Sequence, residues 1–366
     1  MRILHVTAGN LFGGIERMLL GIVSAANDEC AHDIALSFDA RLSRELRDYG
    51  VTPHVIGDVR FRRPDTVWRA RRALRRVISA SAYDAVIAHA PWSCALAGPA
   101  ARRAGVPLLM WVHDAPHGDQ WSERRVARMP PDRFICNSGY TAALVAQWMP
   151  GVAKDVIHPA VAAAPDVSTI ERRTLREELG AREATTVILI AARLEAWKGH
   201  RVLIEAARQL RGDIVVWIAG GPQRPAEAAY AEMLSRLAAG TAVRFLGERV
   251  DVPRLMAAAD IYCQPNTAPE PFGVVFVEAL AAGTPVITTA MGGATEIVDE
   301  QCGVLVREST PALVGAALQR LIDDSSLRNA LGSQGPARAR RISDPADAVR
   351  HVCDAVREQR LRSSAA

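Results

Sequence analysis

The sequence lacks an apolar run long enough to span a membrane. A membrane-spanning helix needs roughly 18 or more consecutive apolar residues, and the 366-residue chain contains no such run. Its first residues, MRILHVTAGN, begin as a short strand and not as the long apolar region of a signal peptide. We therefore expect a cytoplasmic protein, either free or attached to the inner face of the membrane.

Cysteines are few and scattered. They stand at Cys30, Cys94, Cys136, Cys263, Cys302 and Cys353. This distribution has neither the paired spacing of a zinc site nor the density of a disulfide framework. We expect all six to be reduced and buried.

Excess charge of one sign and the common phosphate and metal motifs are also missing. The chain has 44 Lys plus Arg against 40 Asp plus Glu, a formal net charge of +4 that is too small to indicate a nucleic-acid-binding protein. Its glycine-rich N-terminal loop matches neither G-x-G-x-x-G nor the phosphate loop that ends in Gly-Lys-Ser/Thr. Because there is no Asp-x-Asp cluster either, we expect no metal and no separate cofactor.

What the chain does have is a strand-helix alternation that occurs twice, before and after the proline- and alanine-rich stretch PAVAAAPDVS. This pattern predicts an α/β protein with two Rossmann-like domains facing a cleft, residues 1–160 and 161–342, and a terminal helix, 343–366, that packs back on the first domain. The expected strands cover 2–7, 34–38, 52–56, 83–89, 106–112 and 133–136, then 186–191, 214–219, 243–246, 261–264, 286–288, 291–297 and 303–306.

In the first half, several polar or flexible residues follow predicted strands. Gly13 and Gly14 follow the first strand, and His89 and His113 stand at the ends of two later ones. Ligands of open α/β sheets collect at the carboxyl ends of strands, so these residues are candidates for a site. The alternative is that the histidines only hydrogen-bond within the sheet edge, and that Glu16 only pairs with a helix dipole.

The segment from Arg60 to Arg76 is the most basic part of the chain. From Asp65 onward Val67, Ala70 and Leu74 form a helical apolar stripe, which predicts an amphipathic helix with an arginine-rich outer face. That face is either simply solvated or attached to an anionic membrane surface, with Trp68 as an interfacial anchor.

The stretch Gln264–Pro285 is the strongest candidate for a ligand site. Glu270 and Glu278 stand eight positions apart around a Pro-Phe-Gly turn and an apolar run, which predicts a buried helix with Glu278 about two turns inside it. The backbone from Gly273 to Val275 would then offer free N–H groups to a phosphate while the carboxylates bind hydroxyls. The alternative is that the prolines only break the chain and that Glu278 is a solvated helix residue.

Two cations complete this site. Arg193 and Lys198 lie in a loop after a predicted strand, and both are common diphosphate ligands. They would neutralise a leaving diphosphate without a metal ion.

At this point the chain resembles glycosyltransferase family 4, the retaining nucleotide-sugar enzymes of the GT-B fold. The resemblance rests on ARLEAWKG, IAGGP, VRFLGERVDVPRLMAAADIYCQPN, EPFGVVFVEALAAGTPVI, MGGATEIV and CGVLV, and in the first half on GGIER and the His113 loop. It implies transfer of a hexose-type sugar from a nucleoside-diphosphate sugar, with UDP expected, to a glycan, lipid-linked or small-molecule hydroxyl. A sugar-nucleotide 2-epimerase and a non-catalytic nucleotide-sugar-binding protein remain alternatives.

The resemblance also implies residue roles. Arg193 and Lys198 correspond to the diphosphate-binding pair, Glu278 to the ribose-binding glutamate, Glu270 to the glutamate beside the transferred sugar, and His113 to a histidine that contacts that sugar. The other donor-side residues implied are Gly13, Gly14, Gly221, Arg249, Phe272, Gly273, Val274 and Val275. The acceptor side would include Glu16, His89, Trp92 and His117.

Overall fold

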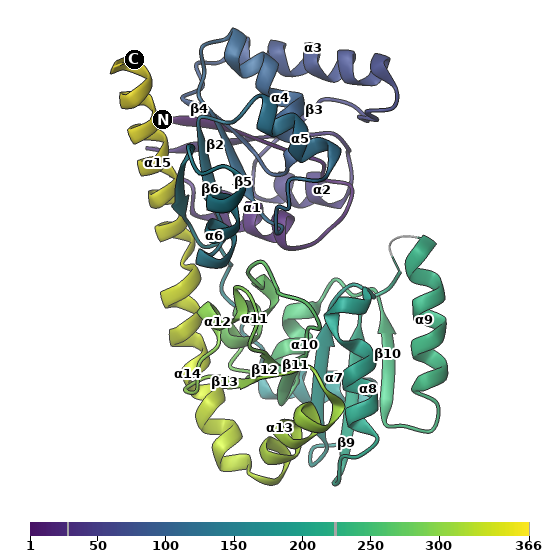
Figure 1. Ribbon diagram of the computed structural model, residues 1–366. Coiled ribbons are helices and arrows are strands. Elements are labelled where there is room, and N and C mark those ends of the chain that lie inside the picture. Colours follow the sequence, from purple (N-terminus) through teal and green to yellow (C-terminus); the bar gives the residue numbers. More distant parts are fainter. Residues whose placement is uncertain (28, 223–224, 366) are drawn as a thin grey trace. The chain divides into compact units, whose positions relative to one another are not determined.

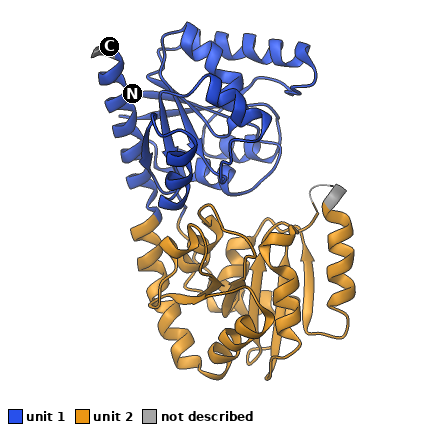
Figure 2. Ribbon diagram, in the orientation of Figure 1, with its two compact units in different colours: residues 1–162, 343–366 blue, residues 163–342 orange. Residues whose placement is uncertain are grey.

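The computed structural model describes residues 1–27, 29–222 and 225–365, which form two compact units (Figure 2). Unit 1 comprises residues 1–162 and 343–366, and unit 2 comprises residues 163–342. The first division lies two residues beyond the predicted one, and the second lies at the predicted position. Helix α15 (Pro345–Ala365) belongs to unit 1, where it packs against α1 (Gly14–Ala25).

Unit 1 is built on a seven-stranded sheet in the order β3-β2-β1-β4-β5-β6-β7, with every neighbouring pair parallel (Figure 1). Its strands are β1 (Arg2–Thr7), β2 (Ala31–Leu36), β3 (His54–Val55), β4 (Ala85–Ala88), β5 (Leu108–Val112), β6 (Arg133–Cys136) and β7 (Ala153–Val156). Parallel strands covered on both faces are continuous apolar runs, which is why most of these were recognisable from the sequence. Strand β7 was not predicted; its residues, like those of β3, are only partly buried or exposed.

Helices cover both faces of this sheet. Alternate residues of β1 face opposite ways, so that Ile3 joins a core shared with α1 and α15 while Leu4 joins a second core. The second core includes Leu74 and Val126. Besides α1 and α15, the helices of unit 1 are α2 (Arg41–Asp48), α3 (Pro64–Ala80), α4 (Pro91–Arg103), α5 (Trp121–Arg128) and α6 (Gly139–Trp148).

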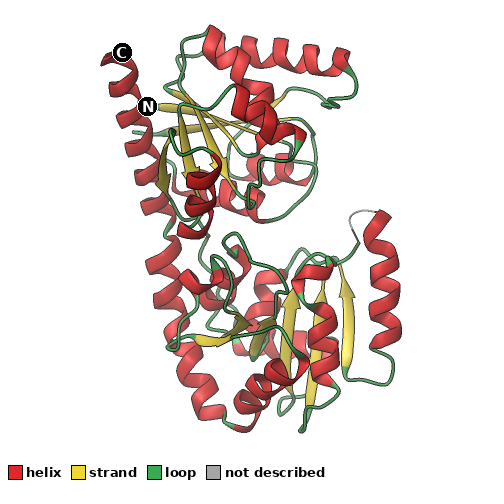
Figure 3. Cartoon of the chain, viewed as in Figure 1, coloured by secondary structure: helices red, strands yellow, loops and turns green. Residues whose placement is uncertain are grey.

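Unit 2 has the same design around a six-stranded parallel sheet in the order β10-β9-β8-β11-β12-β13 (Figure 3). Its strands are β8 (Thr186–Ala191), β9 (Ile214–Ala219), β10 (Val243–Gly247), β11 (Ile261–Gln264), β12 (Val286–Thr289) and β13 (Gly303–Val306). Its helices are α7 (Thr169–Glu178), the 3-10 turn η1 (Ala196–Lys198), α8 (His200–Ala207), α9 (Pro225–Leu237), α10 (Val252–Ala258), α11 (Val274–Ala281), α12 (Ala294–Ile297), α13 (Pro311–Asp323) and α14 (Ser325–Ser343).

The predicted strand at 291–297 is wrong. Residues Met291 to Gly293 form a loop, and α12 follows it. Two consecutive glycines suit a strand poorly, and here the loop packs on a neighbouring one instead. Gly293 N donates to Glu270 O at 2.7 Å, and Gly292 forms an isolated bridge with Glu270.

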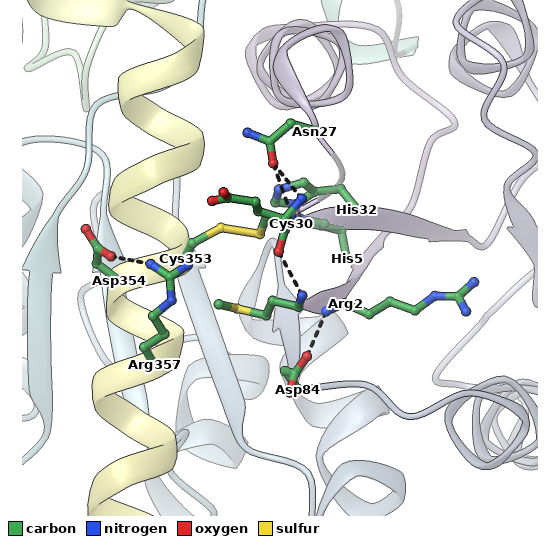
Figure 4. The surroundings of a disulfide bond; sticks show 11 residues. Arg2, His5, Asn27, Cys30, His32, Asp84, Cys353, Asp354 and Arg357 are labelled. Atoms are coloured by element: carbon green, nitrogen blue, oxygen red, sulfur yellow. Dashed lines mark hydrogen bonds and ion pairs between the residues drawn. A yellow bond between two sulfur atoms is a disulfide. The ribbon is translucent and has the colours of Figure 1, made fainter.

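The expectation of six reduced cysteines is wrong for one pair. Cys30 and Cys353 form a disulfide that joins the start of β2 to α15 (Figure 4). The two residues are 323 positions apart, so no local spacing could have indicated their pairing. The other four cysteines are free and buried, as predicted.

Burial raises the pKa of the free thiols, to about 12 for Cys94 and Cys136 and to about 11 for Cys302, so these groups are protonated at neutral pH. Among the described residues, one cluster has the spacing for a metal ion, namely Cys30, His32 and Cys353. Its two sulfurs are bonded to each other. Across the same described ranges, no helix is both long and apolar enough to cross a membrane.

Candidate functional site

The strand order of unit 2 places its candidate residues at one point of the sheet. From β8 the chain runs outward through β9 to β10, then returns to β11 on the other side of β8 and continues to β12 and β13. The carboxyl ends of β8 and β11 therefore flank the switch point, where open α/β sheets bind ligands. The loop after β8 carries Arg193 and Lys198, and the loop after β11 carries Glu270.

These two loops meet in an ion pair. Lys198 Nζ lies 2.8 Å from Glu270 Oε2, and both side chains are largely buried. Two further side chains donate to the same oxygen: Asn266 Nδ2 at 2.9 Å and Gln264 Nε2 at 3.3 Å. The sequence predicted that Lys198 and Glu270 share a site but gave no sign of the two amides.

Arg193 lies beside this pair in the loop after β8. Its Nη1 is 3.0 Å from Glu195 Oε1, in a geometry that does not form a hydrogen bond. Glu195 Oε2 accepts instead from Trp197 Nε1 at 3.1 Å, and Lys198 Nζ lies 3.7 Å from the centre of the Trp197 ring. The guanidinium thus keeps a buried nitrogen without a hydrogen-bond partner at the switch point.

Two glycines allow the loops to come this close. Gly199 has a φ of 81°, and a Cβ added there would lie 2.0 Å from Pro265 O in the facing loop. Gly273 caps α11 with a φ of 110°, and its Cβ would lie 2.4 Å from the Phe276 ring. A side chain at either position would force the two loops apart or unseat the first turn of α11.

Helix α11 begins at Val274, directly after Gly273, so its first N–H groups follow the Glu270 loop. Phe272 is buried, while Val274 and Val275 are partly exposed. Glu278 is the fifth residue of α11 and lies just over one turn inside it, less than the predicted two turns.

Both carboxylates approach the buried ring of Tyr262. Burial is the main cause that raises the pKa of this phenol, and the negative charges of Glu270 and Glu278 raise it further. The phenol donates to Gln264 Oε1 at 2.8 Å, the amide whose nitrogen holds Glu270. Tyr262 therefore stays protonated, and its hydroxyl holds Gln264, which in turn donates to Glu270.

Gly221 and Arg249 lie in neighbouring loops at the same edge of the sheet. Gly221 follows β9, and a Cβ added there would lie 3.6 Å from Glu248 N in the loop after β10. Arg249 follows β10 and makes a two-pronged ion pair with Asp251, at 2.8 Å and 2.7 Å. Its predicted contact with the base stays a prediction.

Unit 1 has its own switch point, between β1 and β4. Gly13 and Gly14 lie after β1, where the Glu16 carboxylate accepts from Gly13 N at 2.9 Å and caps α1. Glu16 is buried and holds the glycine loop in place. Its predicted place on the acceptor side stays a prediction.

Behind this edge, four histidines form a continuous chain of hydrogen bonds. His32 Nδ1 lies 2.9 Å from His5 Nε2, His5 Nδ1 lies 2.8 Å from His89 Nε2, and His89 Nδ1 lies 3.0 Å from His113 Nε2. Burial lowers the pKa of each, to about 4 for His32, so the rings are neutral near pH 7. The chain starts beside the disulfide and ends at His113, after β5.

This chain changes the interpretation of His89. Its ring is fully buried and both nitrogens are used, so it supports His113 rather than contacting an acceptor. His113 is partly exposed. His5 and His32 were missed because fully buried parallel strands show no alternation that would single out one polar residue.

The other two acceptor-side candidates lie near the same edge. Trp92 is partly buried near the start of α4 and packs against the second core of unit 1. His117 is exposed, and its backbone N–H donates to Glu123 Oε1 at 3.4 Å. The structure brings neither ring into the histidine chain.

Two family models match the chain. "Glycosyltransferase Family 4" matches residues 12–164, and "Glycosyl transferases group 1" matches residues 171–338. Together they cover every strand of both sheets except β1, and they include all the candidate residues discussed above.

Curated relatives match over about half of the chain. A D-inositol 3-phosphate glycosyltransferase of Corynebacterium kroppenstedtii is 35% identical over 192 residues, 49% of this chain and 42% of that protein. A GDP-mannose-dependent monoacylated alpha-(1-6)-phosphatidylinositol monomannoside mannosyltransferase of Corynebacterium glutamicum is 34% identical over 180 residues, 46% of each chain. The chain thus spans less than half the length of these relatives.

A solved structure matches almost the whole chain. HepE of Anabaena, crystallised with UDP and glucose, is 24% identical, covers 97% of this chain and 99% of its own, and has a TM-score of 0.85. At that identity the likeness establishes the fold, which is GT-B. The chain, with its two parallel α/β sheets and both family models matched in order, belongs to glycosyltransferase family 4.

Proposed function

We propose that this protein transfers a hexose from a nucleoside-diphosphate sugar, with UDP as the nucleotide, to a hydroxyl group of a glycan, a lipid-linked or a small-molecule acceptor. The observation that carries this proposal is the buried Lys198–Glu270 pair at the switch point, with Arg193, whose Nη1 is ion-paired to Glu195 without a hydrogen bond, in the same loop as Lys198. Two cations and a helix N-terminus converge there, which suits a diphosphate. The capture of UDP and glucose by HepE, of the same fold, supports the choice of nucleotide.

The donor would be held from both ends. Arg193, Lys198 and the first N–H groups of α11 would hold the diphosphate, Glu278 the ribose hydroxyls, and Glu270 the hydroxyls of the sugar. The Lys198–Glu270 contact would then open or be shared with the ligand, since the ammonium group has three donors.

We further propose that the reaction retains the anomeric configuration without a covalent intermediate. The bond between the anomeric carbon and the diphosphate oxygen breaks, and its electron pair leaves with the diphosphate. The acceptor oxygen bonds to the carbon on the same face and passes its proton to the departing diphosphate oxygen. Arg193 and Lys198 stabilise the charge that develops on that oxygen.

The surroundings of Glu270 argue against a glycosyl-enzyme intermediate on this residue. One carboxylate oxygen already accepts from Lys198, Asn266 and Gln264. A carboxylate held by three donors is a weak nucleophile. A covalent sugar adduct on Glu270, detected by mass spectrometry after incubation with donor, would contradict this mechanism.

The function is tested by incubating the protein with UDP-, GDP- and ADP-hexoses, each with and without acceptors that include inositol phosphates and glycolipids. We expect release of UDP that depends on the acceptor, and no loss of rate on adding EDTA because the two cations replace a metal. An altered free sugar without acceptor would instead indicate an epimerase. Binding of UDP-sugar without any product would indicate a sensor.

A further inference from the structure

A groove on unit 1 lies outside the candidate donor site. It has a volume of about 1250 Å³ and lies along α3, α4 and α5, the helices that cover the second core. Residues from α3 that face it, Pro64, Val67, Trp68, Arg71 and Arg75, recur three or four positions apart and so form one face of the helix. The predicted outer face of α3 is therefore divided: Arg71 and Arg75 face the groove, and Arg72 and Arg76 do not line it.

The groove is lined by seven guanidinium groups and no carboxylate. They belong to Arg60, Arg62, Arg63, Arg71, Arg75, Arg103 and Arg125. Asp58 and Asp65, from outside the lining, pair with Arg60 and Arg63. In the described residues, the other five have no acidic group within ion-pair distance, so the groove carries an uncompensated positive charge.

Arg71 is the groove arginine whose surroundings are clearly unfavourable to its positive charge. Its Nη2 donates to Ala95 O at 3.1 Å, but its Nε is buried without a hydrogen-bond partner. Burial lowers the pKa of Arg71, and the positive charges of Arg125 and Arg75 lower it further. An anion in the groove would offset this repulsion between the three guanidinium groups.

The rest of the lining is apolar and aromatic. Val67, Pro99 and Ala100 lie between the arginines, while Trp68 and Trp121 are about half exposed, at 57% and 49%. The Phe61 and Trp121 rings lie in contact, with centres 4.5 Å apart. Large exposed aromatic rings beside cationic side chains are typical of surfaces that meet the boundary between lipid head groups and acyl chains.

We propose that this groove binds an anionic phospholipid of a membrane surface, with the phosphate held by Arg71, Arg75 and Arg125 and the upper acyl chain lying against Val67, Trp68 and Pro99. This goes beyond the proposed transfer reaction, which uses none of these residues. Free phosphate would leave the apolar lining uncovered, and a nucleic acid would use the charge but not the aliphatic surface. Of these three, an anionic phospholipid alone matches both the arginines and the apolar residues of the lining.

The position of the groove suits an enzyme that works beside a membrane. Trp121 opens α5 eight residues after His113, so one short segment joins the groove to the carboxyl edge of the sheet of unit 1. The binding is peripheral, since it needs only side chains of α3, α4 and α5.

The test is flotation of the full chain with vesicles of phosphatidylcholine alone and of phosphatidylcholine mixed with phosphatidylglycerol. We expect the protein to float with the anionic vesicles and not with the neutral ones, and the binding to weaken as salt screens the charges. Equal flotation with both, or flotation with neither, would overturn the proposal.

The chain offers a matched pair of variants. Arg75→Glu/Arg125→Glu changes two groove residues, whereas Arg76→Glu/Arg128→Glu makes the same change of charge on the same two helices, outside the lining. We expect the first double variant to lose anionic-vesicle binding by about 30-fold or more, and the second to lose far less. Equal losses would mean that only net charge matters, and the groove assignment would be wrong.

Two further measurements exclude other occupants and misfolding. Trp68→Ala, at an exposed position, should weaken the binding that remains at high salt, and no change would remove the apolar half of the proposal. Tight binding of inorganic phosphate or of a single-stranded oligonucleotide that competes with vesicles would replace the lipid by that ligand. Circular dichroism of every variant reports on folding, and UDP binding, which uses residues of unit 2, separates this proposal from the proposed transfer activity.

Discussion

Lys198 and Lys154 are the two lysines of the chain, which otherwise uses arginine for positive charge. Lys198 is in the Glu270 ion pair, and Lys154 lies in the edge strand β7 of the other unit. We expect Lys198→Met to lower kcat/KM about 10²- to 10³-fold, because a cation aimed at the leaving diphosphate is lost while the side-chain volume is kept. Steady-state kinetics with the donor that the substrate panel identifies measure this.

Lys154→Met is the matched control and should retain wild-type kinetics. Circular dichroism and a urea melt of each variant establish that both remain folded. Turnover within about threefold of wild type in Lys198→Met would remove this residue from the chemistry.

The histidine chain predicts an acid limit to the stability of unit 1. Burial lowers the folded-state pKa of His5, His32, His89 and His113 below their usual value of 6.5. Below pH 6.5 the unfolded chain therefore binds more protons than the folded one, and stability falls as the pH drops toward 4. Each histidine contributes a slope of about 1.4 kcal/mol per pH unit in that window. Above pH 6.5 the histidines are neutral in both the folded and the unfolded chain, so they no longer lower the stability.

Urea unfolding between pH 7.5 and about 5 measures this slope, with the histidine signals of an NMR spectrum reporting which rings titrate. Unit 2 is an internal control, because it contains a single histidine, His200, whose pKa burial lowers to about 4. A free energy of unfolding for unit 1 that stays constant down to pH 5 would show that the rings are not held neutral.

At the scale of elements, the disulfide gives α15 a covalent link to the strand layer of unit 1 in addition to its apolar contacts. The sulfurs join residues 30 and 353, and Val352 and Val356 of α15 lie in the same core as Ile3. Closing so long a loop restricts the unfolded chain strongly, which typically contributes about 2–5 kcal/mol. We expect Cys353→Ser to lower the free energy of unfolding of unit 1 by that amount under oxidising conditions.

A reductant should lower the stability of the wild-type protein by a similar amount and leave Cys353→Ser unchanged. Cys94→Ser, which replaces a free buried thiol of unit 1, should be destabilising both with and without reductant. Identical wild-type stability with and without reductant would contradict a stabilising role for the bond.

Some helices and strands could be predicted from the sequence, and others could not. Apolar runs such as 186–191 and 214–219 are strands as predicted, because parallel strands buried on both faces need continuous apolar side chains. Residues 291–297 have the same apolar ends but form a loop and a short helix, since their role is to hold the Glu270 backbone. Contacts between distant segments decide such cases, and no local pattern reports them.

The residues of the candidate site likewise divide into those that could be predicted from the sequence and those that could not. Arg193, Lys198 and Glu270 could be predicted because charged residues directly after apolar strands are few and meet at one edge of a sheet. The Asn266 and Gln264 donors and the His5–His32 contact depend on side-chain directions inside the fold. Their residue types are too common for sequence alone to single them out.

At the scale of the whole molecule, each unit has its own sheet and core, and the features discussed above divide between them. The disulfide and the histidine chain belong to unit 1, whereas Lys198, Glu270 and α11 belong to unit 2. Ligands and solution conditions that act on one set of residues should therefore act on one unit's unfolding transition.

We expect calorimetry to resolve two transitions that respond separately. UDP at 100 times its dissociation constant should stabilise unit 2 by about 2.7 kcal/mol, because only the folded state binds it. Reductant or a pH of about 5.5 should lower the transition of unit 1, which holds the disulfide and the four histidines of the hydrogen-bonded chain. Cys353→Ser and Lys198→Met assign the transitions, since the first removes the response to reductant and the second weakens the response to UDP. A single transition that UDP raises and reductant lowers as a whole would show that the two units unfold together.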